Sequence, residues 1–250
     1  MDLGVKQSVN QMQGPFYSVV IPVFNEQENL RPLARGVRET LESLGGDFEL
    51  IFVDDGSQDQ SHEILRSLHQ EDPRVGYLRL DANSGQSTAL WAGLKEARGQ
   101  VIITMDGDLQ NDPHDIPLLL KNLEGCEVVT GWRQKRQDPW LKRVSTRVAN
   151  FVRDIVTMEQ IRDTGCGFKA FRRECLEAVV PFDGLHRFLP TLFRMRGFRV
   201  REVPVPHHPR RHGVSKYNIR NRLFRGMLDL LGVRWLKKRR LSYQVVERGR

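Results

Sequence analysis

The sequence predicts an α/β fold in which helices cover both faces of a mostly parallel central sheet. Short apolar, β-branched runs alternate with stretches of helical periodicity along the first half of the 250-residue chain, as is typical of strand–helix–strand units. The length fits one large domain, or one domain with a small appendage. The expected strands are Tyr17–Val23, Glu49–Val53, Tyr77–Leu80, Val101–Met105 and Glu127–Gly131, and the helices between them are Glu26–Leu44, Ser61–His69, Ser84–Ala97 and Asp115–Leu123.

The pattern changes after Pro139. We expect a basic amphipathic helix, a glycine-containing turn that enters a short strand, a further helix and strand, and a polar mobile loop. These elements are Trp140–Thr157, Asp163–Lys169, Arg187–Arg196, Arg199–Val205 and His207–Tyr217. We divide the chain into a flexible tail (1–15), a main domain (16–216) and a basic amphipathic C-terminal helix with its tail (217–250).

Charge is distributed unevenly along the chain. Residues 1–131 carry 10 Lys and Arg against 21 Asp and Glu, whereas residues 132–250 carry 29 against 10. An acidic half suits metal binding, and a basic half suits phosphates or anionic lipid. The alternative is two solvated faces of unlike charge.

The cysteines and the apolar runs argue against several classes of protein. The three cysteines lack a CxxC spacing, which argues against a disulfide framework and a structural zinc site and favours reduced thiols. We expect no signal peptide, because residues 1–14 are polar, and no membrane-spanning segment, because no apolar run is long enough.

Polar clusters follow three of the expected strands. They are Pro22–Glu26, Asp54–Ser57 and Asp106–Gln110. In a parallel sheet, ligands bind outside the carboxyl ends of the strands, so these clusters predict one shared site. For Asn25 and Ser57, helix N-capping is the alternative.

The carboxylates of Asp106 and Asp108 are expected to bind a divalent cation, with Gln110 as a further oxygen ligand. Oxygen ligands favour Mg²⁺ or Mn²⁺ over Zn²⁺, and Mg²⁺ completes its coordination with substrate phosphate and water. The pair therefore predicts a phosphorylated ligand. A surface turn with local hydrogen bonds is the alternative.

Two further segments could contact a nucleotide. Asp54 and Asp55 offer acceptors to a base or ribose, and Gly56 allows close backbone approach. Asn83–Ser87 opens a helix whose N-terminus could face a phosphate. The chain contains neither a P-loop nor a G-x-G-x-x-G fingerprint, which argues against a dinucleotide enzyme.

Basic residues form two sets that could bind phosphate oxygens. They are Arg133, Arg136, Arg143 and Arg147, and Arg210, Arg211 and Lys216. For each residue, exposed charge is the alternative. His207, His208 and His212 could assist, although we expect them to be solvated in the loop.

The segment Ile219–Leu236 mixes apolar and basic residues at helical spacing. A basic amphipathic helix without a spanning segment fits an interfacial anchor; the alternative is a helix packed on the core with a basic rim. The residues expected to share one apolar stripe are Ile219, Leu223, Met227, Leu230 and Leu231.

Together these motifs resemble the inverting glycosyltransferases of family 2, which have a GT-A fold, and more closely their dolichol-phosphate mannosyltransferase and polyprenyl-phosphate glycosyltransferase branch. The resemblance covers about residues 17 to 236. It rests on residues 19–26 (VVIPVFNE), 53–59 (VDDGSQD), 85–93 (GQSTALWAG), 105–110 (MDGDLQ), 163–169 (DTGCGFK) and 211–217 (RHGVSKY).

The resemblance implies roles for matching residues. Pro22, Glu26, Asp54 and Asp55 would bind the nucleoside, and Gln86 would lie near the nucleotide. Asp106, Asp108 and Gln110 would hold Mg²⁺ or Mn²⁺ against the diphosphate. Arg133 and Arg143 would lie near the acceptor phosphate or the leaving diphosphate, and Arg211 and Lys216 would close over phosphate.

The resemblance also implies a reaction, in which a sugar moves from GDP-mannose or a UDP-sugar to a dolichyl or undecaprenyl phosphate. A phosphate acceptor is already largely dianionic at neutral pH, so it needs no strong base. We therefore expect Asp163 to orient other groups, whereas a sugar or other non-lipid acceptor would use Asp163 as a base. That second acceptor class remains an alternative.

Location and partners follow from the same resemblance. The chain lacks the spanning helices that often follow this catalytic domain, so we expect peripheral contact with the cytoplasmic face of a membrane, alone or through a membrane-protein partner. The sequence pI near 9.7 allows a nucleic-acid-binding module. That alternative leaves the three acidic strand ends unexplained, so we expect no nucleic-acid partner.

Overall fold

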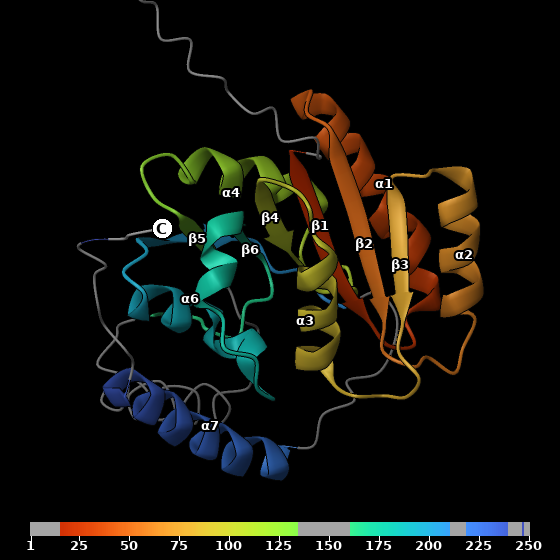
Figure 1. Ribbon diagram of the computed structural model, residues 1–250. Helices are drawn as coiled ribbons and strands as arrows, with labels where there is room; N and C mark the ends of the chain where they lie inside the picture. Colours follow the sequence, from red (N-terminus) through yellow and green to blue (C-terminus); the bar gives the residue numbers. More distant parts are fainter. Residues whose placement is uncertain (1–15, 135–160, 211–218, 240–246, 248–250) are drawn as a thin grey trace, which may run out of the picture.

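The computed structural model describes residues 16–134, 161–210, 219–239 and 247. A seven-stranded sheet in the order β3-β2-β1-β4-β6-β5-β7 forms its centre (Figure 1). Neighbouring strands run parallel except β6, which is antiparallel to both β4 and β5. The strands are β1 (Tyr17–Val23), β2 (Phe48–Asp54), β3 (Val75–Arg79), β4 (Val101–Thr104), β5 (Val128–Arg133), β6 (Lys169–Arg172) and β7 (Val200–Val205).

Helices cover both faces of this sheet, so the predicted α/β class is confirmed. One face carries α1 (Gln27–Leu44), α2 (Ser61–Glu71) and α4 (Ile116–Asn122), and the other carries α3 (Gln86–Glu96), α6 (Leu185–Met195) and α7 (Ile219–Arg239). Two short 3₁₀ turns, η1 (Pro113–Asp115) and η2 (Arg173–Ala178), complete the described elements.

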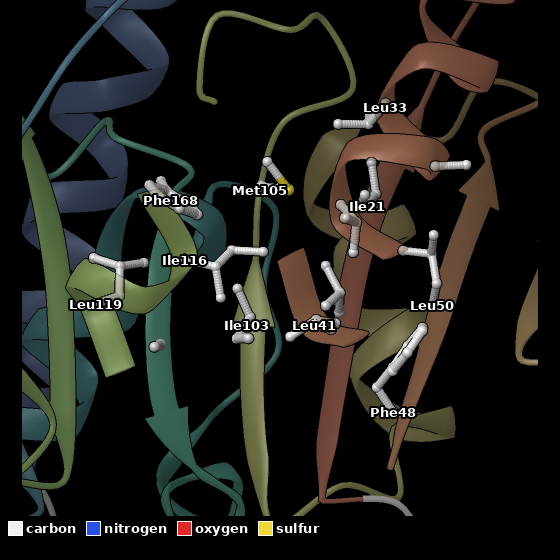
Figure 2. Close-up of a cluster of buried hydrophobic side chains, with 14 of the residues drawn as sticks. Ile21, Leu33, Leu41, Phe48, Leu50, Ile103, Met105, Ile116, Leu119 and Phe168 are labelled. Atoms are coloured by element: carbon white, nitrogen blue, oxygen red, sulfur yellow. The ribbon is translucent and has the colours of Figure 1, made fainter. Parts of the chain in front are cut away.

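The alternation of side chains along β1 explains this three-layer arrangement. Successive side chains of a strand point to opposite faces of the sheet. Val19 and Ile21 pack in the core beneath α1, whereas Val20 packs in the core beneath α3. Figure 2 shows the first of these cores, in which Leu33 and Leu41 of α1 lie against β1 and β2 and Ile116 of α4 lies against β4.

Most expected elements appear within two residues of their predicted bounds. The third strand starts at Val75 rather than at the predicted Tyr77. The prediction began too late because Gly76 interrupts the apolar run that marks a strand in the sequence. The expected helix from Asp115 begins as a 3₁₀ turn and becomes α-helical at Ile116. The expected helix Trp140–Thr157, the tail 1–15 and most of the loop before Ile219 lie outside the described residues.

Helix α7 corrects the predicted apolar stripe. Leu230 packs against the core beneath α3 and α6, whereas Leu231 is 58% exposed. Consecutive helical residues point about 100° apart, so these two neighbours cannot share one face. None of the helices in the described ranges is both long and apolar enough to cross a bilayer.

Candidate active site

The three polar clusters predicted from the sequence meet at one edge of the sheet. Strand β1 pairs in parallel with β2 on one side and with β4 on the other. The carboxyl ends of these three strands therefore lie side by side. This places the loops that begin at Pro22, Asp54 and Asp106 around a common space.

The loops after β1 and β2 are tied together by reciprocal hydrogen bonds. The Asn25 N–H donates to Ser57 Oγ (2.9 Å), and the Gln58 N–H donates to Asn25 Oδ1 (2.7 Å). Asn25 has a φ of 53°, in the left-handed region that Asn tolerates better than most residues. The N-capping alternative for Asn25 and Ser57 is therefore wrong, because both side chains bond across to the neighbouring loop.

The carboxylates that end β2 have internal partners. Asp55 accepts hydrogen bonds from the N–H groups of Ser84 (2.7 Å) and Gly85 (2.9 Å), at the start of α3. Asp54 Oδ1 accepts from the Ser57 N–H (2.8 Å), and its Oδ2 is buried without a hydrogen-bond partner among the described residues. These bonds hold the α3 N-terminus against β2.

Gly56 lies between these acidic residues and the next loop. Its φ is +70°, and a Cβ atom there would lie 2.6 Å from the Ala82 carbonyl carbon. Glycine is therefore required here by the close approach of the chain's own backbone, and the approach of this backbone to a base or ribose stays a prediction.

Asp106 lies at the centre of the site. Its Oδ1 accepts a hydrogen bond from Gln86 Nε2 (2.8 Å), the first residue of α3. Burial raises the pKa of Asp106 to about 6, and the nearby negative charge of Asp108 adds to this increase. A cation beside the two carboxylates would remove that repulsion.

Asp108 is anchored by the turn that follows β4. Its Oδ1 accepts from the Gln110 N–H (3.1 Å), and Leu109 between them has a φ of 57°. A non-glycine residue in this region is strained by roughly 1–2 kcal/mol. Strain of this kind concentrates at functional sites, which is consistent with a turn shaped to aim Asp108.

Arg210 bridges two acidic groups from different loops. Its Nη2 lies 2.7 Å from Asp108 Oδ2, and its Nη1 lies 3.7 Å from Glu26 Oε1. Glu26 also accepts from Asn29 Nδ2 (2.6 Å). The basic segment after β7 therefore reaches across the strand ends and supplies a positive charge next to the predicted metal ligand.

The turn Asp163–Lys169 closes the other side of the site. Arg133, at the end of β5, donates from Nε to Asp163 Oδ2 (2.6 Å) and from Nη2 to Asp163 Oδ1 (2.8 Å). The carbonyl of Gly167 accepts from Thr104 Oγ1 (2.7 Å). A Cβ atom on Gly167 would lie 2.5 Å from Asp106 Oδ2, so only glycine lets this turn approach the carboxylate so closely.

A small cavity lies between α3, α6 and this turn. Pro22, Gln86, Asp106, Lys169 and His186 contribute to its lining, and its volume is about 20 Å³. That volume holds one water molecule and is too small for a sugar ring. A sugar would therefore bind at the open edge of the site, or the surrounding groups would have to move apart.

Lys169 is the buried cation of this cavity. It is 1% exposed, and its Nζ donates to the backbone carbonyl oxygens of Cys166 and His186. Burial lowers its pKa, although the nearby negative charge of Asp106 acts in the opposite direction. Lys169 thereby ties the glycine turn to the first turn of α6.

The donor set at the end of β4 fits a hard divalent cation. Within the described ranges, no group of three or more His, Cys, Asp or Glu side chains could hold a metal. Mg²⁺ and related ions commonly take only one or two carboxylates and complete their coordination with phosphate oxygens and water. Asp106 and Asp108 satisfy that requirement, and the negative charge of Asp108 adds to the increase that burial causes in the pKa of Asp106.

The structure brings together most of the predicted site residues. Pro22, Gln86 and Asp106 line one cavity, while Asp108 and Glu26 share Arg210. The side chain of Gln110 has a different partner, because its Nε2 donates to the His208 carbonyl (3.3 Å); metal binding would use its Oε1. Arg143, Arg211 and Lys216 lie outside the described residues.

Two residues at the site, Lys169 and His186, were not selected from the sequence. Lys169 ends the glycine-turn motif, so it carried a signal that was not used. Arg210 was expected to bind phosphate, and within the protein it contacts Asp108 and Glu26. His186, which bonds Ser87 Oγ through Nδ1 (2.7 Å), is a single histidine without a motif. Only the tertiary contacts reveal its position.

Comparisons with known proteins identify the family of the chain. The sequence model described as Glycosyl transferase family 2 matches residues 18–180. A dodecaprenyl-phosphate galacturonate synthase of Rhizobium johnstonii is 40% identical over 222 residues, which cover 86% of this chain and 65% of the relative. An undecaprenyl-phosphate 4-deoxy-4-formamido-L-arabinose transferase of Edwardsiella ictaluri is 39% identical over 218 residues, covering 86% of this chain and 67% of the relative. This chain therefore spans about two thirds of the length of these relatives.

Solved structures share the fold. A glucosyl-3-phosphoglycerate synthase of Mycobacterium tuberculosis, in complex with Mn²⁺, uridine diphosphate and phosphoglyceric acid, has a TM-score of 0.67 and 21% identity, covering 88% of this chain and 79% of that one. A mannosyltransferase of Pyrobaculum calidifontis, in complex with GDP-Man and Mn²⁺, has a TM-score of 0.60 and 19% identity, covering 92% and 66%. At these identities the comparison establishes the common fold.

Proposed function

The chain belongs to glycosyl transferase family 2, and we propose that it moves a sugar from a nucleotide diphosphate sugar to a polyprenyl phosphate, with inversion at the anomeric carbon. The observation that carries the proposal is the pairing of Asp163 with Arg133 at the edge of a site whose other side holds Asp106 and Asp108. Both curated relatives described above are named as polyprenyl-phosphate sugar enzymes.

The donor side of the proposal rests on the ends of β1, β2 and β4. Asp106 and Asp108 would hold Mg²⁺ or Mn²⁺, which stabilises negative charge on the leaving diphosphate. Pro22, Glu26, Asp54, Asp55 and Gln86 would surround the nucleotide. Because Asp54 and Asp55 are buried and hydrogen-bonded to backbone, we assign them chiefly to shaping the loops that contact it.

The acceptor side of the proposal rests on the two hydrogen bonds that Asp163 accepts from Arg133. A carboxylate held by two hydrogen bonds from a guanidinium is stabilised in its charged form and is a weak proton acceptor. A phosphate acceptor needs no strong base, because its second pKa lies near 6. Arg133, with Arg143, Arg211 and Lys216 from outside the described residues, would supply positive charge for the acceptor phosphate and the leaving diphosphate.

The contacts of Asp163 bear on the choice between the two acceptor classes. A sugar hydroxyl acceptor would need a general base within hydrogen-bond reach, and both carboxylate oxygens of Asp163 already accept from Arg133. The geometry therefore favours the phosphate acceptor over a sugar or other non-lipid acceptor. Because the polyprenyl chain lies in the bilayer, we place the protein peripherally on the cytoplasmic membrane face.

The test is transfer of labelled sugar from a panel of GDP- and UDP-sugars to a short-chain polyprenyl phosphate, with Mg²⁺, with Mn²⁺ and with chelator. Metal-dependent label in the lipid phase supports the proposal and identifies the donor. Donor hydrolysis, or transfer to a water-soluble acceptor without lipid product, would support the proposed donor site and reject the proposed lipid acceptor. The relatives differ in the sugar that their names give, so the panel needs a uronic acid and an amino-sugar donor.

A further inference from the structure

Helix α7 exposes a line of large apolar side chains. Leu228 is 54% exposed, Leu231 is 58% exposed and Trp235 is 62% exposed. Spacings of three and four residues place them on one side of the helix. Among the large apolar side chains that the structure describes, these three are the most exposed. We refer to Leu228, Leu231 and Trp235 as the apolar line.

Positive charge borders the apolar line. Arg234, Lys238 and Arg239 are exposed beside it. The sequence of α7 contains seven Arg and Lys and a single acidic residue, Asp229. Asp229 forms an ion pair with Arg187 of α6 (3.0 Å), so its charge is matched within the protein and the exposed side of the helix is basic.

The opposite side of α7 is fixed to the domain. Val233 is 1% exposed, and Leu230 and Leu236 pack against the core formed with α3 and α6. Gly184 at the start of α6 allows close contact, since a Cβ atom there would lie 2.6 Å from Asp229 Oδ2. The apolar line therefore has a defined direction relative to the rest of the molecule.

This docking also places α7 at the active-site end of the sheet. The Gly184 N–H donates to Ser87 Oγ (2.8 Å), which also bonds His186 Nδ1 (2.7 Å). His186 lines the cavity that contains Asp106. In Figure 1, α7 lies beneath α6 on the lower side of the view, which is the side toward which the arrow of β3 points.

We propose that the apolar line and its basic border bind the surface of a bilayer that contains anionic lipid, and so hold the active-site end of the sheet against that membrane. The inference rests on the proposed function, because it supplies the surface by which the chain reaches a lipid-borne phosphate. Interfacial helices combine an apolar face with Lys and Arg in this way, and Trp is enriched at the membrane–water boundary.

Charge complementarity favours the membrane over a second copy of the chain. A two-fold interface through the apolar line would bring the same patch of both copies together, and thus the two basic borders, each with Arg234, Lys238 and Arg239, into one interface. Such like-charge contact is unfavourable, whereas anionic lipid neutralises the same groups.

The experiment is flotation of the chain with vesicles of phosphatidylcholine alone and of phosphatidylcholine with about 30% phosphatidylglycerol, at low and high salt. We expect binding to the anionic vesicles that weakens in high salt, with a blue shift of tryptophan fluorescence. The triple variant Leu228→Ser, Leu231→Ser, Trp235→Ser should bind roughly tenfold or more weakly and lose the shift. Leu44→Ser, at an exposed apolar residue that ends α1, is the matched control and should bind like the native chain.

Equal flotation of the triple variant and the native chain would overturn the inference, as would failure of the native chain to bind anionic vesicles. A dimer that forms in the native chain and is lost in the triple variant, without vesicle binding, would instead assign the line to self-association. Circular dichroism melting verifies that the variant is folded. Sugar transfer to a short-chain acceptor dispersed in detergent separates the two proposals. The triple variant should retain this transfer activity, because the assay needs no membrane binding. A native chain that binds vesicles but shows no transfer would reject the proposed function alone.

Discussion

Arg133 and Asp163 form a paired contact at the edge of the site, with Nε to Oδ2 at 2.6 Å and Nη2 to Oδ1 at 2.8 Å. Two residues 30 positions apart in the sequence, at the end of β5 and in the turn before β6, are thereby held together. A carboxylate in this state orients the arginine better than it accepts a proton. The first prediction follows from this contact.

Replacement of Asp163 should harm activity far less than replacement of Asp108. Asp163→Asn retains one acceptor for Arg133, so we expect kcat/KM to fall by about tenfold. Asp108→Ala removes a predicted metal ligand, and we expect a loss of roughly a hundredfold to a thousandfold. Steady-state kinetics with a short polyprenyl phosphate measures both. Equal, near-complete losses would favour Asp163 as a general base and a hydroxyl acceptor.

Asp106 should destabilise the folded protein above pH 6 when no metal is bound. Its folded pKa of about 6 exceeds the ordinary value of 3.8, so the protonated carboxyl is favoured in the fold. The associated stability is complete below the unfolded pKa and is lost as the pH rises through the folded pKa. Asp106→Asn should therefore be more stable than the native chain by about 1–3 kcal/mol at pH 7.5 in chelator, and by much less at pH 4.

Urea unfolding of both proteins across this pH range provides the measurement. The difference between them isolates Asp106, because all other titrating groups are shared. A difference that does not change with pH would show that the carboxyl has an ordinary pKa. The same variant should lose the stabilisation that Mn²⁺ gives the native chain.

Gly167→Ala should displace Asp106. The added methyl group would lie 2.5 Å from Asp106 Oδ2, so the turn or the carboxylate must move. We expect a loss of about 1–3 kcal/mol in stability and a weaker affinity for Mn²⁺, measured by titration calorimetry. Gly76→Ala is the control, because a Cβ atom in that strand meets only the Leu50 carbonyl at 3.9 Å. A Gly167→Ala variant with native Mn²⁺ affinity would contradict the crowding seen at this turn.

Arg210→Gln should increase the affinity for a divalent cation and decrease the transfer rate. The guanidinium lies 2.7 Å from Asp108 and repels a cation bound to that carboxylate. Its removal should tighten Mn²⁺ binding by roughly fivefold, from Coulomb repulsion in a high-dielectric site. Arg31→Gln, which breaks an exposed ion pair with Glu71 elsewhere, should leave the affinity unchanged. Weaker Mn²⁺ binding in Arg210→Gln would show that Arg210 orients Asp108 for the metal.

Much of the fold was readable because its signals are local. The apolar, β-branched run Val101–Thr104 followed by Asp106 and Asp108 marks a buried strand and the polar loop after it, and parallel strands place such loops at one edge. The direction of a strand, by contrast, cannot be predicted from a local pattern. The antiparallel course of β6 depends on its pairing with β4 and β5, and no pattern within Lys169–Arg172 encodes that choice.

The sequence by itself determined the sheet class, the loops that bear the site and the acidic residues that carry its charge, because periodicity and residue type express burial and chemistry over short distances. Only the tertiary structure decided which partner each charged group has. Arg210 meets Asp108 across 102 positions, Asp163 is held by Arg133, and Leu231 faces outward while Leu230 packs inward. These outcomes depend on the orientation of whole elements, which is set by the core they share and by no single segment of the chain.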